Sequence, residues 1–284
     1  MLHKQITKIP SELIIKKIKE FILEDIPNTD VTTNNIFIND LEIKSAKLLA
    51  KSDLVLSGEI LLDYFFDENQ ITRFYKDGDF IQKGEYIAEI KTTSSDILKK
   101  ERVMLNLIQR MSGIASITKI YVDKVKDSGI KILDTRKTTP GLRYFEKYAV
   151  QCGGGTNHRF DLSSAVMIKD NHIACAGSIS KAIEMVLDAK VNVPIEIEVD
   201  NLEQLDEVLK YPVDSILLDN FNRVMTITAV KTIREKQIKQ IVIESSGGIN
   251  LDNISDYIGT GIDAISSGAL THSVKSADIS LDII

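Results

Sequence analysis

The chain has 284 residues, of which 43% are hydrophobic and 27% are charged, a composition typical of a folded globular protein rather than a disordered one. Its 41 acidic and 35 basic residues give a net charge of −6, which argues against a general nucleic-acid binder or a protein attracted to anionic membranes. Two cysteines are too few for a disulfide framework or a zinc site. Because no segment is apolar enough for a membrane span or a signal peptide, we expect a cytoplasmic protein.

The first hundred residues predict a small α+β domain. An amphipathic helix is expected from Ser11, the candidate N-cap, with apolar residues at helical spacing as far as Ile22. Strand-like runs follow in EIKSAKLLAK, ITRFYKDGD and EYIAEIKTT, separated by glycine-containing turns.

A long helix is predicted from Ser95 to about Lys126, with a break near Gly113. One stripe of this helix is apolar and indicates a buried face. A second stripe is polar and includes Arg102, Asn106 and Gln109. The pattern alone favours a solvated surface charge for Arg102.

After Gly129 short apolar strands alternate with amphipathic helices, which predicts parallel strands joined by helical crossovers. No G-x-G-x-x-G segment follows a strand, so an α/β barrel is favoured over a dinucleotide-binding sheet. Six strands can be counted, fewer than the eight of a complete barrel: KILDT, AVMIK, IEIEV, SILLD, QIVIES and DAISS.

Each of these strands ends in polar or charged residues, and the carboxyl ends of parallel strands meet at one edge of the sheet. Four cations, Arg136, Lys137, Arg159 and Lys169, fall within 34 positions of an acidic chain. Such a cluster is unfavourable without anions, so phosphate or several carboxylates are the expected ligands. A ring of salt bridges that closes the barrel is the structural alternative.

Glycine-bearing turns follow the last two strands, at Gly247-Gly248 and at Gly268, where α/β barrels often bind phosphate. The carboxylates of Glu198 and Asp219 end two other strands. They could be partners of the cations, or they could hold Mg²⁺ and stabilise positive charge in a substrate.

Several segments together resemble the quinolinate phosphoribosyltransferase family. The most specific are TRKTTPG, GGGTNHR and IKDNH, and the similarity continues through IEIEVDNLEQLDEVL, IESSGGINLDNI and TGIDAISSGALTHS. It extends back to ERVMLNLIQRMSGIAS and to DVTT at Asp30–Thr33, so it covers most of the chain.

The resemblance implies an N-terminal α+β sandwich domain at residues 1–112. It also implies an incomplete parallel α/β barrel of about seven strands at residues 113–284, and the last residues of the chain can pack back on the first domain. It implies a pentosyltransferase of NAD biosynthesis that converts quinolinate and 5-phosphoribosyl 1-diphosphate, with Mg²⁺, to nicotinate mononucleotide, CO₂ and diphosphate. It also implies a homodimer in which Arg102 reaches the neighbouring site, and it leaves a hexamer open.

The same resemblance assigns residue roles. Catalytic roles fall to Lys137, Glu198 and Asp219, and the two carboxylates would hold Mg²⁺ directly or through water. The substrates would be bound by a larger set of residues, which comprises Arg102, Thr135, Arg136, Lys137, His158, Arg159, Lys169, Glu198, Asp219, Ser246, Gly247, Gly248, Gly268, Ala269 and Leu270.

A phosphoribosyltransferase that uses nicotinate is less favoured, because a monocarboxylate needs fewer cations, and three further alternatives stay open at this stage. The first is a paralogue of the same fold from molybdenum-transport operons with another substrate, although the intact NHR and IKDNH segments favour the quinolinate enzyme. The second is a barrel that only binds a phosphorylated metabolite. The third is an aldolase that forms a Schiff base at Lys169.

Overall fold

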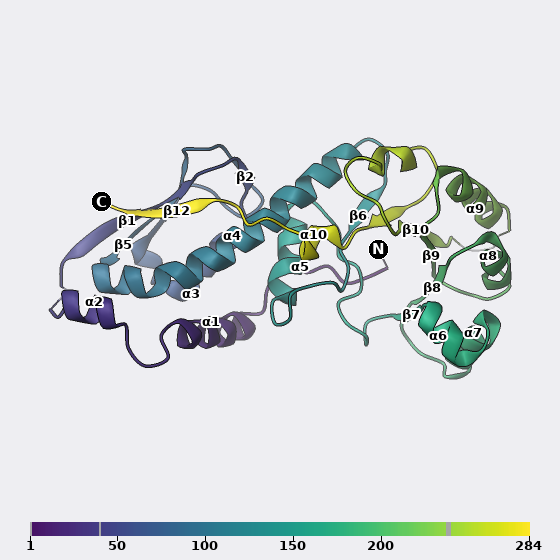
Figure 1. Cartoon of the computed structure of the whole chain (residues 1–284), viewed down its shortest axis with the longest axis horizontal. Coiled ribbons are helices and arrows are strands. Elements are labelled where there is room, and N and C mark those ends of the chain that lie inside the picture. Colours follow the sequence, from purple (N-terminus) through teal and green to yellow (C-terminus); the bar gives the residue numbers. More distant parts are fainter. Residues whose placement is uncertain (1, 40, 237–239) are drawn as a thin grey trace. The chain divides into compact units, whose positions relative to one another are not determined.

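The computed structural model describes residues 2–39, 41–236 and 240–284, which divide into two compact units (Figure 1). The N-terminal unit comprises residues 6–119, 139–154 and 273–284, and the barrel unit comprises the segment before Ile6 together with residues 120–138 and 155–272. The position expected for a domain boundary, between residues 112 and 113, lies within one helix. Within the described residues, the structure contains no helix that combines the length and apolarity needed to cross a membrane.

A four-stranded antiparallel sheet forms the centre of the N-terminal unit. Its order is β12-β1-β5-β3, so the last strand of the chain pairs with the first. The bounds are Ile43–Ala50 for β1, Ile71–Arg73 for β3, Tyr86–Thr93 for β5 and Ile279–Ile283 for β12, and a separate pair is formed by β2 (Leu54–Val55) and β4 (Phe80–Ile81).

Several helices of the N-terminal unit bury apolar side chains. Helix α1 buries Ile14 and Ile18. The expected cap at Ser11 is wrong, because Pro10 is the N-cap and Ser11 is already the first helical residue; its hydroxyl accepts a hydrogen bond from Tyr64. The helices are α1 (Ser11–Asp25), α2 (Val31–Ile36), η1 (Glu59–Leu61), α3 (Leu62–Phe65), η2 (Glu68–Gln70), α4 (Ser94–Lys124) and α5 (Arg143–Cys152).

Helix α4 is continuous over 31 residues, so the predicted break near Gly113 is wrong. A Cβ at Gly113 would lie 2.4 Å from the carbonyl oxygen of Lys275. The glycine therefore permits the C-terminal segment to cross the helix closely, and it does not interrupt the helix. Gln109, one turn earlier, donates a hydrogen bond to the carbonyl of Ile279 in the same segment.

The barrel unit contains a sheet of six parallel strands in the order β6-β11-β10-β9-β8-β7 (Figure 1). This confirms the incomplete α/β barrel. In place of the seventh expected strand, the described residues form only an isolated parallel bridge between Leu133 and Thr156 at the free edge of β6. The strands are β6 (Lys131–Leu133), β7 (Val166–Ile168), β8 (Ile195–Val199), β9 (Ser215–Asp219), β10 (Val242–Ser246) and β11 (Ala264–Ser266).

Helices connect these strands and pack beside one another in chain order along the sheet. Since all six strands run in the same direction, their carboxyl ends share one edge, where the connecting loops begin. The helices are α6 (Asp170–Ala176), α7 (Ile179–Asp188), α8 (Leu202–Val208), α9 (Arg223–Lys236), η3 (Ile254–Tyr257) and α10 (Ala269–His272).

Candidate active site

The carboxyl ends of the parallel strands bring the predicted charged residues of the barrel unit to one edge. β9 ends at Asp219, which pairs in register with Ser246 at the end of β10. The hydroxyl of Ser246 lies 3.1 Å from that of Ser266, the last residue of β11. Glu198 lies near the end of β8, and Lys169 follows β7 directly. The strand ends are therefore neighbours in space.

Lysines and carboxylates face each other across this edge. Lys169 forms an ion pair with Glu198, whose pKa is raised by burial in spite of that contact. Burial also raises the pKa of Asp219, against the opposing charges of Lys169 and Lys137. The Lys169–Glu198 contact is thus a salt bridge of the kind expected if the charges only close the barrel. The negative charges of Glu198 and Asp219 are nevertheless not fully balanced by it.

Two guanidinium groups, those of Arg136 and Arg159, lie close enough to repel each other. Arg159 is 6% exposed, its Nη1 donates to the carbonyl of Ala165 at 3.0 Å, and burial together with the charge of Arg136 lowers its pKa. The Nε of Arg136 is buried and has no hydrogen-bond partner among the residues that the structure describes. Neighbouring guanidiniums with unused donors are suited to a planar anion with more than one carboxylate.

The segment before Arg159 is fixed by a buried aspartate, Asp134. Its carboxylate accepts hydrogen bonds from the backbone amide of His158 at 2.8 Å and from the side chain of Asn157 at 2.6 Å. Asp134 directly follows β6, so one strand end positions both Arg136 and the loop that carries Arg159. The sequence prediction assigned no role to Asp134, although its place at a strand end was the available signal.

The turn after β10 depends on glycine. Gly247 has a φ of +85°, and a Cβ there would lie 2.3 Å from the Oδ1 atom of Asn220, which follows β9. Gly248 has a φ of +64° and is exposed. Backbone amides at such a turn can approach a phosphate closely.

Lys137 lies along the turn after β11. A Cβ at Gly268 would be 2.8 Å from the Cδ of Lys137, and the backbone amide of Lys137 donates to the hydroxyl of Thr135 at 3.0 Å. Ala269 is half-buried, whereas the side chain of Leu270 is fully buried. At Leu270 only the backbone can therefore contact a ligand.

Arg102, the remaining predicted residue, belongs to the N-terminal unit and lines a cavity of about 470 Å³ within that unit. Its side chain is 61% exposed. The cavity also contains Asn106 of the same polar stripe, Arg110, and two acidic residues, Glu24 and Asp25. Arg102 and Asn106 are exposed, as the pattern alone predicts for Arg102, and both line this cavity, whereas Gln109 donates a hydrogen bond to the C-terminal segment.

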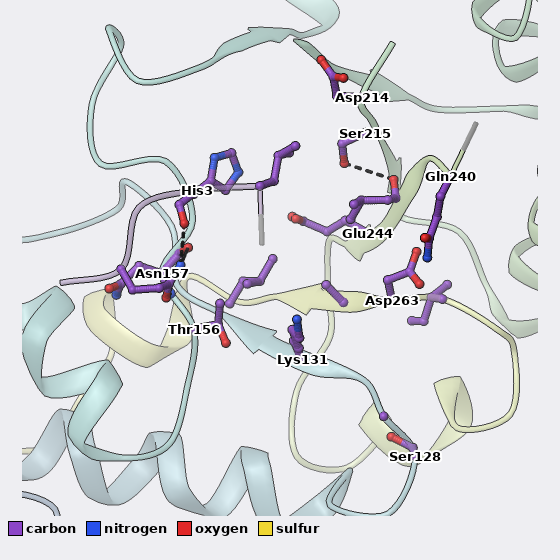
Figure 2. A pocket seen from close by; sticks show the side chains of 17 residues that line it. His3, Ser128, Lys131, Thr156, Asn157, Asp214, Ser215, Gln240, Glu244 and Asp263 are labelled. Carbon is purple, nitrogen blue, oxygen red and sulfur yellow. Dashed lines mark hydrogen bonds between the residues drawn. The ribbon is translucent and has the colours of Figure 1, made fainter. Parts of the chain in front are cut away.

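A second cavity, of about 680 Å³, lies at the opposite, amino ends of the barrel strands (Figure 2). Lys131, Ser215 and Ala264, the first residues of three strands, line it. His3 and Glu244 also line this cavity, in which none of the predicted site residues takes part.

The sequence prediction missed two buried glutamates in the barrel interior, Glu196 and Glu244. Both are at most 1% exposed, and both lie close to His158. Burial raises the pKa of Glu244 to about 7, whereas His158 keeps the pKa of Glu196 below its usual range in spite of burial. Glu196 precedes Glu198 by two positions on β8, so the alternation of the strand was a signal that both face inward.

Fold and site define a class of protein. An open parallel α/β barrel presents arginines, lysines, carboxylates and glycine turns at the carboxyl ends of its strands, which is the arrangement of an enzyme that acts on a phosphorylated, polyanionic substrate.

Comparison with known proteins gives the family. Residues 30–112 match the model of the quinolinate phosphoribosyl transferase N-terminal domain, and residues 114–282 match that of the C-terminal domain. A probable nicotinate-nucleotide pyrophosphorylase [carboxylating] of Bacillus subtilis is 45% identical over 273 residues, which are 94% of this chain and 92% of the relative. The nicotinate-nucleotide pyrophosphorylase [carboxylating] of Mycobacterium leprae is 45% identical over 226 residues, which are 79% of each chain.

Solved structures agree with this match. The nicotinate-nucleotide pyrophosphorylase of Ehrlichia chaffeensis superposes with a TM-score of 0.90 at 40% identity, covering 98% of this chain and 100% of the other. That of Francisella tularensis also gives a TM-score of 0.90, at 35% identity, covering 99% of this chain and 100% of the other. This chain belongs to the quinolinate phosphoribosyltransferase family.

Proposed function

We propose that this chain transfers the phosphoribosyl group of 5-phosphoribosyl 1-diphosphate to quinolinate, releasing CO₂ and diphosphate and forming nicotinate mononucleotide for NAD biosynthesis. The observation that carries the proposal is the pair of neighbouring guanidiniums, Arg136 and Arg159, at the same strand ends as Lys169. A dicarboxylate satisfies two adjacent cations better than a monocarboxylate does, and quinolinate carries two carboxylates on one planar ring.

The ribose 5-phosphate would bind at the glycine turns after β10 and β11, where backbone amides could approach the anion: Gly248 is exposed, and nothing lies within 4 Å of an added Cβ there. Lys137 lies along the second of these turns and would neutralise the phosphates of the substrate. Thr135 would keep the segment of Lys137 in place through its hydrogen bond to the backbone amide.

Loss of diphosphate leaves positive charge at C1 of the ribose, which Glu198 and Asp219 would stabilise. Oxygen donors of this kind suit Mg²⁺, and the two carboxylates are close enough that Asp219 raises the pKa of Glu198. We therefore propose that both hold Mg²⁺, directly or through water. When bound, the ion would neutralise the diphosphate.

The ring nitrogen of quinolinate has a free electron pair, so its attack on C1 needs no general base. Once quaternised, the ring accepts the electrons of the bond to the 2-carboxylate, which leaves as CO₂, and C2 then takes up a proton from water to give nicotinate mononucleotide. In the attack on C1 the chain's own residues act by binding and orienting the two substrates and by stabilising charge.

We further propose a homodimer in which Arg102 of one subunit enters the barrel site of the other. Supporting this, Arg102 is exposed yet lines a cavity with a second cation, Arg110, in a unit that carries no other predicted site residue.

The two free cysteines, Cys152 and Cys175, are consistent with a protein that works in the reducing cytoplasm.

The experiment that tests the reaction uses quinolinate labelled in its 2-carboxyl group. We expect labelled CO₂ only when quinolinate, phosphoribosyl diphosphate and Mg²⁺ are all present. Lys137→Ala should abolish most of the release, whereas Lys181→Ala, at an exposed position on α7, should not change it. Absence of release from the folded dimer would reject the quinolinate reaction in favour of a paralogue with another substrate, and ligand binding without diphosphate release would indicate a binding protein.

A further inference from the structure

Behind the predicted substrate site, three buried side chains form a cluster inside the barrel. The Nε2 atom of His158 lies 3.0 Å from the Oε2 atom of Glu196 on β8 and 3.5 Å from the Oε2 atom of Glu244 on β10. The three side chains are at most 5% exposed. The other carboxylate oxygen of Glu196 accepts a hydrogen bond from Ser215 at 2.9 Å.

The hydrogen bonds define which nitrogen of His158 carries the proton. Its Nδ1 atom accepts a hydrogen bond from the backbone amide of Arg159 at 2.7 Å. A neutral imidazole that accepts at Nδ1 carries its proton at Nε2. The Nε2–H group therefore lies beside two buried carboxylates, and the Oε2 atom of Glu196, at 3.0 Å, is the nearer, although this contact does not have the geometry of a regular hydrogen bond.

Two histidines and a glutamate in this place have the composition of a metal site, since ligand atoms of His3, His158 and Glu196 lie within 4.8 Å of one another. A metal ligand, however, needs a free electron pair on the nitrogen that faces the ion, and a metal-bound histidine normally donates through its other nitrogen. His158 has the reverse arrangement, because its other nitrogen accepts. The cluster is therefore better described as a hydrogen-bonded support.

What the cluster supports is Arg159. The imidazole fixes the backbone amide of this residue, and the carbonyl of Ala165 fixes its guanidinium. The charge of Glu196 also acts on Arg159, in opposition to the nearby charge of Arg136. A shift of His158 would move the amide of Arg159, and with it the cation expected to bind a substrate carboxylate.

We propose that Glu196 is a positioning residue: by accepting the Nε2 proton of His158 it fixes the ring that holds Arg159 in place to bind the substrate dicarboxylate. The kinetic test of this role rests on the proposed function. The position of the proton on the imidazole can be measured without any enzymatic activity.

The test compares two replacements of Glu196. In Glu196→Gln the amide oxygen can still accept from His158, while the amide nitrogen can donate to Ser215, whose hydroxyl also has the carbonyl of Val242 within 3.1 Å. In Glu196→Leu the nearer carboxylate is lost, and the Oε2 atom of Glu244, at 3.5 Å, is the carboxylate oxygen that stays beside Nε2. We expect Glu196→Leu to raise the KM for quinolinate at least about tenfold. Its kcat and its KM for phosphoribosyl diphosphate should change less than about threefold, and Glu196→Gln should resemble the unaltered enzyme.

A matched control separates positioning from general destabilisation. Ile216→Ala, at a fully buried position on β9, should lower the melting temperature without changing the KM for quinolinate. Ser215→Ala removes the hydroxyl that holds Glu196, and it provides a milder variant if Glu196→Leu does not fold. It should raise the KM for quinolinate and leave that for phosphoribosyl diphosphate unchanged.

Two kinetic results would overturn the proposal. One is an unchanged KM for quinolinate in folded Glu196→Leu or, if that variant does not fold, in Ser215→Ala. The other is an equal increase in Glu196→Gln, since that would assign the effect to charge and not to the hydrogen bond. Nitrogen NMR of labelled histidine provides the independent readout: the Nε2–H form of His158 is expected in the unaltered chain, even if the proposed reaction fails. A ring protonated at Nδ1 would contradict the proposal directly.

Discussion

At the scale of single residues, burial determines how the ionisable groups inside the barrel behave. Glu196 and Glu244 are equally buried and approach the same imidazole, yet their pKa values shift in opposite directions. Glu196 is closer to His158 and accepts a hydrogen bond from Ser215, both of which favour its charged form. Glu244 is farther from His158 and is repelled by the charge of Glu196, so it retains its proton to about pH 7.

This difference predicts a dependence of stability on pH. In the unfolded chain Glu244 titrates near its ordinary pKa of 4.5, whereas in the folded chain its pKa is about 7. Between these values the folded state holds a proton that the unfolded state has lost, so the free energy of unfolding falls as pH rises, by at most about 1.4 kcal/mol per pH unit. Glu244→Gln cannot ionise, and its urea midpoint should exceed that of the unaltered chain more at about pH 7.5 than at about pH 5. An equal difference at both pH values would contradict the assignment, and Glu235→Gln on the exposed face of α9 is the control.

The shape of the guanidinium at Arg159 provides a second prediction at this scale. Arg159→Lys retains the positive charge but loses the planar donor set that contacts Ala165 and faces Arg136. We expect kcat/KM for quinolinate to fall by roughly 10²–10³-fold with little loss of stability, as measured by steady-state kinetics and thermal melting. Arg234→Lys is the matched control, because Arg234 donates to a carbonyl and to Asp263 away from the strand ends. Similar kinetics for both variants would mean that charge alone suffices at Arg159.

At the scale of secondary-structure elements, hydrophobic periodicity predicted the barrel strands, but it missed features that depend on contacts between segments distant in the chain. The six barrel strands were found because each is a short apolar run that ends in polar residues, and their parallel order placed Arg136, Lys169, Glu198 and Asp219 at one edge. The break at Gly113 was wrong, since the glycine accommodates a segment about 160 positions later in the chain. Asp134 and Glu196 each had a local signal in the strand pattern, but their roles were missed because that pattern does not show which buried groups they contact.

Gly113 tests this explanation. In an isolated helix, glycine to alanine is stabilising by about 1 kcal/mol. Here the new methyl group would meet the carbonyl oxygen of Lys275 at 2.4 Å, so we expect Gly113→Ala to destabilise the chain by roughly 1–3 kcal/mol in urea unfolding. Asn106→Ala, at an exposed position on the same helix, should be neutral or slightly stabilising. If Gly113→Ala were also stabilising, the close crossing of the C-terminal segment would not be the reason for the glycine.

At the scale of the whole molecule, the predicted site residues are divided between the two compact units. The barrel unit contains the guanidinium pair, the lysines and the carboxylates, whereas the N-terminal unit contributes Arg102 in a cavity of its own. If Arg102 is needed for catalysis, we propose that one subunit of a homodimer supplies it to the barrel of the other. Under this arrangement each site contains residues from two chains.

Subunit mixing distinguishes shared sites from separate ones. Arg102→Ala and Lys137→Ala should each be nearly inactive, because one lacks the cation from the partner and the other lacks the lysine of the barrel. After equal amounts are unfolded together and refolded, half of the dimers contain one chain of each kind. Every such dimer has one site with both defects and one with neither, so about one quarter of the unaltered activity should return. Light scattering checks that the refolded protein is dimeric, and refolding each variant alone is the control. If the mixture stays as inactive as its components while dimers form, Arg102 does not act across the subunit interface.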